Sequence, residues 1–160
     1  MVGVHAGLEY LMDEAGYSRA GYHRSPVAGR TTGRWVDAHD WVVSIWRHHT
    51  SRDGDPQLHV HAAVVNRVRC PDGVWRSLDS QAIASARPAA GAIAERTAEE
   101  DLSRRLGPEF RMRPDGIARE IVGIDEAVRD LFSSRRRAIS ARTAELAASY
   151  GQRHGYAPSA

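Results

Sequence analysis

The sequence contains no lysine, so all 22 of its basic residues are arginine. An arginine guanidinium binds phosphate through a planar fork of N–H donors, which suits a nucleic-acid partner. A genome rich in G and C also favours arginine and alanine codons, and the composition alone does not separate the two explanations. Because the formal net charge is only +2, a surface that binds DNA has to be a local patch of arginines.

Other features are scarce as well. Cys70 is the single cysteine, which excludes an internal disulfide framework. No apolar run approaches the ~20 residues of a membrane span, and the start, MVGVHAGLEYLMDEAG, has neither the basic nor the apolar region of a signal peptide. We therefore expect a cytoplasmic protein with no membrane partner. With 160 residues, 42% of them hydrophobic, the chain has the length and composition of one globular domain.

Hydrophobic periodicity predicts an α+β fold, with helices packed on an antiparallel sheet. The predicted strands are 41–48, 58–69 and 74–79, which read as one antiparallel sheet, followed by a hairpin over 110–122. The predicted helices are 4–16, 80–106 with a division at Pro88, and a segment that Asp125 caps and that runs with a break to about 153. Residues 17–34 are expected to form a loop or an irregular strand.

Three histidines lie on the two central predicted strands. His59 and His61 flank Val60, and strand alternation points both imidazoles to one face, roughly 7 Å apart along the chain. The preceding strand ends at His48 and His49, which point to opposite faces, so only one of them joins the pair. If His48 joins, it shares a face with Trp46, which we expect to be buried.

Three imidazoles are a donor set typical of a catalytic metal site. They leave coordination positions open, and they leave the charge of the ion uncancelled, which favours an anionic ligand such as a phosphate. The His-x-His pattern also arises by chance in a chain with eight histidines, so the triplet alone does not establish the site.

The segment RHHTSRDGDPQLHVHAAVVNR, residues 47–67, resembles the metal-binding motif of conjugative relaxases of the TrwC/TraI (MobF) type, which are HUH endonucleases. The family pattern is a histidine, then Thr-Ser-Arg, then Asp-Pro-Gln-Leu-His-x-His. This resemblance selects His48 over His49 as the third ligand. Weaker resemblance extends to 72–79, 89–107 and 123–139, so it covers nearly the whole chain.

The resemblance implies that a divalent ion, Mg or Mn with Zn or Ni as alternatives, is held by His48, His59 and His61. Such an ion polarises the scissile phosphate of single-stranded DNA at an origin of transfer. In the family a tyrosinate then attacks, leaving a 5′-phosphotyrosine and a free 3′-hydroxyl. Arg47, Arg52 and Arg69 are candidates for contacts to the DNA backbone. Solvated surface charge is the competing explanation for these arginines.

One departure from the family concerns the nucleophile. Relaxases of this type carry their tyrosines very near the N-terminus, whereas residues 1–16 resemble a helix inside the family domain. Tyr10, Tyr17 and Tyr22 lie in no matching segment, and the last two are expected in a loop. We therefore assign no catalytic residue here and expect a partial relaxase domain. It comprises a metal-binding core (1–124) and a helical segment (125–160) that leads towards a helicase region.

Two other functional classes fit the same residues. An independent metal-dependent phosphodiesterase would use a metal-bound water and cleave DNA without forming a protein–DNA adduct. An inert remnant of a relaxase would bind no metal and would lack a cooperative fold. Both alternatives are decided by measurement of metal binding and of the products formed from DNA.

Overall fold

The computed structural model describes residues 1–24 and 31–158, so parts of the predicted loop 17–34 and of the C-terminal HGYAPSA lie outside the described residues. Helices and antiparallel strands are mixed, as the sequence predicts. The helices are α1 (Val2–Ala15), α2 (Ser80–Leu106), α3 (Glu126–Leu131) and α4 (Ser134–His154). The strands are β1 (Tyr17–Arg24), β2 (Thr31–Asp37), β3 (Val43–Thr50), β4 (Pro56–Val64), β5 (Val68–Arg69), β6 (Trp75–Arg76), β7 (Phe110–Met112) and β8 (Arg119–Ile121).

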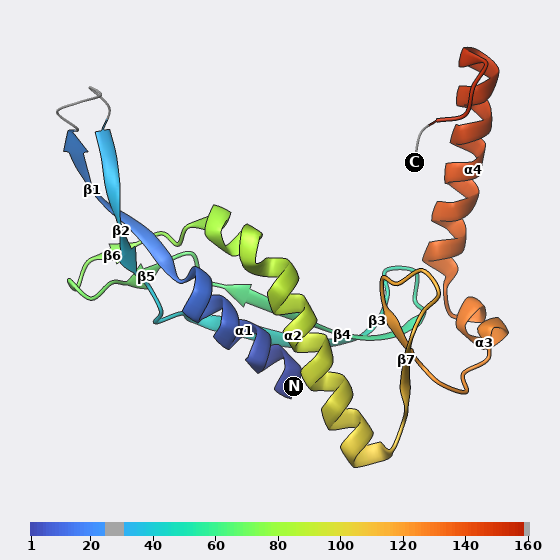
Figure 1. Ribbon diagram of the computed structural model, residues 1–160, viewed down its shortest axis with the longest axis horizontal. Coiled ribbons are helices and arrows are strands. Elements are labelled where there is room, and N and C mark those ends of the chain that lie inside the picture. Colours follow the sequence, from blue (N-terminus) through green and yellow to red (C-terminus); the bar gives the residue numbers. More distant parts are fainter. Residues whose placement is uncertain (25–30, 159–160) are drawn as a thin grey trace.

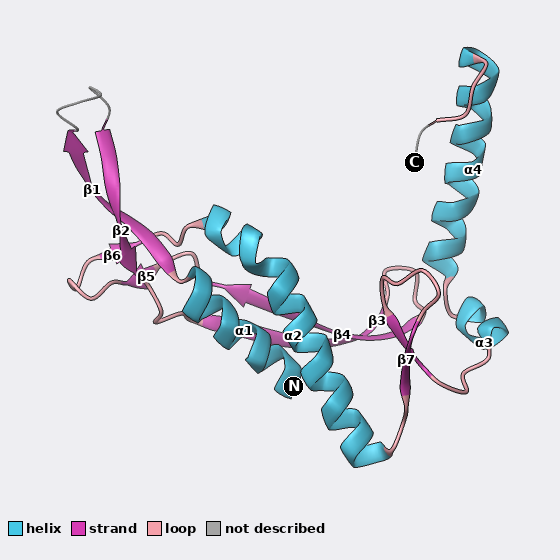
Figure 2. Ribbon diagram, viewed as in Figure 1, coloured by secondary structure: helices cyan, strands magenta, loops and turns pink. Residues whose placement is uncertain are grey.

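The described strands form four separate two-stranded ribbons rather than the single sheet that we predicted (Figure 2). The predicted strand 58–69 is broken, because β4 ends at Val64 and β5 begins at Val68. Asn66 explains the break: its side-chain oxygen accepts a hydrogen bond from the Leu78 backbone N–H at 2.9 Å. The chain therefore leaves the β3–β4 hairpin at this point and turns towards the core.

The core is small and lies where β4 ends and α2 begins. Its fully or almost fully buried members are Ala38, Val68, Cys70 and Leu78, and partly buried hydrophobic side chains pack against them: Val36, Trp41, Val64 and Ile83. The indole of Trp41 donates a hydrogen bond to the Ala38 carbonyl at 2.7 Å. This core fixes the end of the β3–β4 hairpin that lies away from its turn.

Residues 17–24 form strand β1, which pairs antiparallel with β2, so Tyr17 and Tyr22 are in a strand and not in a loop as we predicted. Ser18 and Ala20 are buried while Arg19 between them is exposed on its side chain, which is the alternation of a half-buried strand. For residues 17–34 we predicted a loop or an irregular strand, and the register shift between Ala20 and His23 makes β1 an irregular strand. Its buried residues, Ser18 and Ala20, are small, so no run of large apolar side chains marks the strand in the sequence. The side chain of Tyr22 lies outside what the structure describes.

Helices α1 and α2 pack closely through small residues (Figure 1). Gly3 and Gly7 face the backbone of α2, where an added Cβ would lie 2.2 Å from the Ala94 oxygen and 2.9 Å from the Ala90 oxygen. Helix α2 is continuous through Pro88, which we predicted to divide it. Pro88 is exposed, so its ring lies on the outer surface, where a helix tolerates a weakened hydrogen-bond ladder better.

The C-terminal elements follow the prediction. Strands β7 and β8 pair as the expected hairpin, the Asp125 carboxylate caps α3 by accepting from the Ala127 N–H at 2.7 Å, and a break separates α3 from α4. Neither helix contains a buried residue, and α4 projects away from the rest of the molecule in Figure 1. None of the helices in the described residues is both long and apolar enough to cross a membrane.

Candidate metal centre

The antiparallel register of β3 and β4 brings two of the predicted ligands face to face. His48 pairs directly with His59, and His61 pairs with Trp46. Residues opposite each other project to the same side of a two-stranded ribbon, and His59 and His61 are two residues apart, so all three imidazoles share one face. The register also shifts between His48 and Thr50, so His49 lies at an irregularity and is not paired with a residue of β4.

A tight turn over residues 51–55 returns the chain beside itself. The Ser51 hydroxyl accepts from the backbone N–H groups of Asp53 and Asp55 at 3.2 and 3.1 Å. Gly54 has φ +81°, a left-handed conformation that glycine adopts without steric strain. The Thr-Ser-Arg-Asp-Gly-Asp sequence therefore sets the register that places His48 opposite His59.

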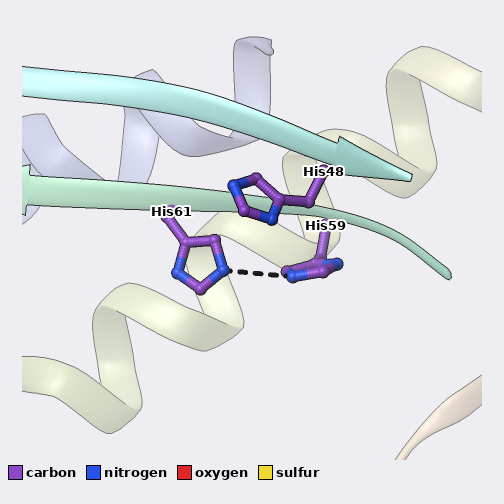
Figure 3. Close-up of side chains that lie close together, drawn as sticks. All are labelled: His48, His59 and His61. Atoms are coloured by element: carbon purple, nitrogen blue, oxygen red, sulfur yellow. Dashed lines mark hydrogen bonds between the residues drawn. The ribbon is translucent and has the colours of Figure 1, made fainter. Parts of the chain in front are cut away.

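The three rings converge on one point (Figure 3). Each histidine offers one nitrogen, and these nitrogens all lie within 4.8 Å of one another. The Nε2 atoms of His59 and His61 are 3.1 Å apart. Two nitrogens that each bind an ion at ~2.0–2.1 Å lie roughly 3 Å apart in tetrahedral or octahedral geometry, so this pair already has the spacing of a bound pair of ligands.

One imidazole is oriented by the backbone. His59 Nδ1 lies 3.0 Å from the carbonyl oxygen of Gln57, which can only accept a hydrogen bond. The Nδ1 of His59 therefore carries the proton, and the lone pair is left on Nε2, the atom nearest to His61. A second ring nitrogen bonded to a carbonyl is the arrangement that commonly fixes metal-binding histidines.

Access to the site is open, since His48 and His61 are exposed and His59 is half-buried. A ligand as large as a nucleic-acid strand can therefore reach the three nitrogens from solvent. Trp46 lies on the same face and is exposed. We had predicted that it would be buried.

The structure separates the three arginines that the sequence suggested for DNA contacts. Arg47 pairs with Val60 and so projects from the face opposite the histidines, while Arg52 lies in the 51–55 turn and Arg69 in β5. Within the described residues none of them forms an ion pair. Arg47 thus lies on a histidine strand but on its other face, and Arg52 lies in the turn that joins the two histidine strands.

A groove that the sequence did not reveal adjoins the same turn. Residues of the β3–β4 hairpin line it on one side and residues near the start of α4 on the other: Ser51, Gln57, Phe132, Arg135, Arg136 and Ile139. Asp55 joins the two sides, because its carboxylate accepts from the Ser134 N–H at 2.8 Å and from the Ser134 hydroxyl at 2.9 Å. The run Arg135–Arg137 is visible in the sequence, but its contact with a turn about eighty residues earlier is not.

A family model described as TrwC relaxase matches residues 2–160. The chain belongs to the TrwC relaxase family. Among curated proteins, the multifunctional conjugation protein TraI of Escherichia coli is 34% identical over 84 residues, which is 51% of this chain and 5% of TraI. Most of TraI therefore has no counterpart in this chain.

Solved structures of the conjugative relaxase TrwC are similar over almost the whole chain. A metal-bound complex of TrwC with oriT DNA gives a TM-score of 0.71 at 32% identity, over 94% of this chain and 47% of that one. A copper-bound TrwC–oriT complex gives 0.63 at 27% identity, over 99% of this chain and 50% of that one. This member of the TrwC family thus spans about half of those structures, and its histidine triad is suited to a divalent metal ion.

Proposed function

We propose that this chain is the metal-binding core of a conjugative relaxase. In this role it positions the scissile phosphate of single-stranded DNA at a transfer origin for attack by a tyrosine. The observation that carries the proposal is the convergence of His48, His59 and His61 on one open face of the β3–β4 hairpin in a TrwC-family chain. The similar metal-bound complex of TrwC with oriT DNA supports it.

The residues present fit a catalytic divalent ion. When bound, such an ion acts as a Lewis acid that withdraws electron density from a phosphate oxygen. The three neutral imidazoles add no negative charge, so they neither repel the phosphate nor fill the coordination sphere. The backbone carbonyl of Gln57 holds the His59 ring. This contact keeps the Nε2 lone pair directed at the site.

The donor set ranks the candidate ions by affinity, whereas the working ion also depends on which ions are available. Nitrogen ligands bind Ni, Cu and Zn more tightly than Mn, and Mg prefers oxygen ligands. We propose that Mg or Mn is the working ion and that Zn or Ni binds more tightly in competition. Titration of the chain with each ion separately tests this order of affinities.

We propose phosphate contacts for arginines near the turn of the β3–β4 hairpin. Arg52 lies in the turn that follows His48, and Arg135 and Arg136 line the groove that also contains Gln57. Neither Arg135 nor Arg136 forms an ion pair within the described residues, so both guanidinium groups remain available to phosphate oxygens. Arg47 and Arg69 remain candidates for contacts to DNA that extends beyond the metal site.

We further propose that no tyrosine of this chain is the nucleophile. The ring of Tyr17 lies against His39 at a centroid distance of 6.5 Å, and Tyr150 donates a hydrogen bond to Tyr156 at 3.2 Å. This bond and burial raise the pKa of the Tyr150 hydroxyl above its ordinary value, which disfavours the tyrosinate that an attack on phosphorus requires.

An adduct assay tests the proposed function. The chain is incubated with manganese and a labelled oriT-like oligonucleotide, alone or with a separate polypeptide that carries a relaxase tyrosine segment. A covalent protein–DNA band is expected only when chain, polypeptide and metal are all present, because the chemistry needs all three at one phosphate. Cleavage without an adduct by the chain alone would instead support a hydrolytic phosphodiesterase, and an adduct mapped to Tyr17 or Tyr22 would show that the nucleophile is internal.

A further inference from the structure

Trp46 lies beside the three histidines on the same face of the β3–β4 hairpin. It pairs with His61 across the hairpin, as His48 pairs with His59, so its side chain projects from the same face as the three ligands. Side chains in directly opposed positions have Cβ atoms about 4.5–5.5 Å apart. Trp46 is therefore a direct cross-strand neighbour of His61, one of the three histidines whose nitrogens converge.

The indole of Trp46 is uncovered, with 59% of the residue exposed. The next pair along the same face, Ser44 and Ala63, consists of small residues that leave the ring open. Two of the other three tryptophans have partners: Trp41 donates a hydrogen bond to Ala38, and the Arg19 guanidinium lies 4.6 Å over the ring of Trp35. Trp75 is also exposed, but it lies in β6, away from the histidines. Among the described residues no aromatic ring stacks on Trp46.

We propose that Trp46 is a stacking platform for a DNA base next to the phosphate at the histidine triad. This inference rests on the proposed function, since it needs a phosphodiester at the metal site. A flat aromatic ring stacks on any base, so it holds the strand without reading its sequence. The base flanking the phosphate would then be fixed on Trp46, and the phosphate would be fixed by the ion.

The matched control is Trp75, which is 58% exposed in β6 and belongs to a different ribbon. We would compare wild type, Trp46→Leu, Trp46→Phe and Trp75→Leu in the presence of manganese. Fluorescence anisotropy would follow two labelled single strands of equal length, a thymidine oligonucleotide and an abasic oligomer with the same phosphates and no bases. Calorimetric titration with manganese would show that each variant keeps its metal site.

Trp46→Leu is expected to weaken binding of the thymidine strand by about 5- to 100-fold, which is the range for loss of stacking on one base. It should leave binding of the abasic strand unchanged. Trp46→Phe should restore most of the affinity because it restores an aromatic face, and Trp75→Leu should bind both strands as wild type does. If Trp46 contacted only other protein residues, its replacement by leucine would affect binding of the two strands equally.

Equal losses on both strands, or no loss for Trp46→Leu, would overturn the assignment of Trp46 while leaving the proposed function standing. If wild type bound neither strand in the presence of metal, the proposed function would fail and the stacking role would fail with it. A lowered manganese affinity of Trp46→Leu would show that Trp46 supports the fold of the site instead of contacting DNA.

Discussion

At the scale of single residues, the choice between the adjacent histidines 48 and 49 is made by the register of β3 and β4. His48 faces His59, whereas His49 lies at the irregularity between His48 and Thr50. We expect His48→Ala to weaken binding of manganese or nickel by about 100-fold or more, since loss of outer-shell partners alone costs 10–100-fold, and His49→Ala to leave it nearly unchanged. Calorimetric titration measures both, and equal losses would contradict the ligand assignment.

The same titration has a defined dependence on pH. A protonated imidazole cannot bind a metal ion, so metal binding releases protons and the affinity falls as the solution becomes more acidic. Gln57 orients His59 through a backbone carbonyl that does not titrate. The pH dependence of wild type and of a Gln57→Ala variant should therefore be the same, because the variant keeps that carbonyl.

Asp72 supplies a pH-dependent contribution to stability away from the metal. Two hydrogen bonds of 2.7 Å from the Arg76 guanidinium, with one from the Val74 N–H, lower the pKa of Asp72 from 3.8 to about 2. A carboxyl whose pKa is lower in the folded state stabilises the fold above its unfolded pKa and loses that effect as the pH falls towards its folded pKa. The contribution is thus present above about pH 4 and lost by about pH 2.

Thermal melts of wild type and Asp72→Asn test this expectation in metal-free buffer. The melting temperature of the variant should lie below that of wild type at pH 5, and the difference should shrink as the pH is lowered through the range from 4 to 2, as expected for linkage to one carboxyl. A difference that stayed constant with pH would mean that the asparagine disturbs the turn itself rather than removing a charge.

Much of the arrangement of the three candidate ligands could be predicted from the sequence, because alternation along a strand is a strictly local rule. The positions of His59 and His61, and the turn that returns the chain from His48, follow from residues close in sequence. The exposure of Trp46 could not be predicted, since it depends on which element covers that face. The role of Asp55 was equally hidden, because its partner Ser134 lies far away in the sequence.

At the scale of elements, Asp55 attaches α4 to the turn of the β3–β4 hairpin. Its carboxylate bonds the first N–H of α4, as a capping side chain does, and loss of such a bond costs about 0.5–2 kcal/mol. We expect Asp55→Ala to speed hydrogen exchange of the backbone amides at the start of α4 by about fivefold, which corresponds to ~1 kcal/mol of local opening. Mass spectrometry of exchanged peptides measures the change.

Asp53 provides the control for this experiment. It lies two residues earlier in the same turn, and its backbone N–H, not its carboxylate, bonds to Ser51. Asp53→Ala should therefore leave exchange in α4 unchanged. Equal acceleration in the two variants would show that the turn has unfolded as a whole and that the tie between Asp55 and Ser134 has no separate effect.

Glycines determine how closely α1 and α2 pack. A Cβ at Gly3 or Gly7 would collide with the α2 backbone, whereas Gly91 has no neighbour within 4 Å. We expect the double variant Gly3→Ala, Gly7→Ala to lose about 1–3 kcal/mol of unfolding free energy through overpacking. Gly91→Ala should gain up to about 1 kcal/mol, because alanine is the better helix former. Urea unfolding followed by circular dichroism measures both changes, and a stabilised double variant would contradict the close packing.

The bounds of helices and strands were predicted well where residues close in sequence determine them. They were predicted poorly where contacts between distant residues determine them. The turn glycines and the Asp125 cap mark their helix ends and hairpins within a few residues. Helix α2 continues through Pro88, and α1 packs against the residues that follow, Ala90 and Ala94, which is a contact between distant segments. The break after Val64 likewise depends on the bond between Asn66 and Leu78, which no local pattern shows.

At the scale of the whole molecule, the accessible surface area is larger than that of a compact monomer of the same mass. The accessible area is 12135 Å², whereas a compact monomer of this mass exposes about 7,900 Å². Large apolar side chains are exposed along the C-terminal elements, and α3 and α4 bury none of their residues. The chain spans about half of the TrwC structures that it resembles.

The exposed edge of the β3–β4 hairpin gives the last prediction. Each of these strands pairs only with the other in the described part of the chain, and unpaired strand edges with apolar side chains invite association. We expect light scattering to show that the average mass rises with protein concentration. Leu58→Lys, at a residue of β4 that is 70% exposed, should reduce this rise because a charge blocks pairing of edges.

Leu106→Lys, at a residue 76% exposed at the end of α2, tests whether removal of any exposed leucine suffices. If both variants reduced the rise equally, general apolar adhesion would explain it, and a wild-type monomer at high concentration with a cooperative melt would show that the chain protects its edges unaided.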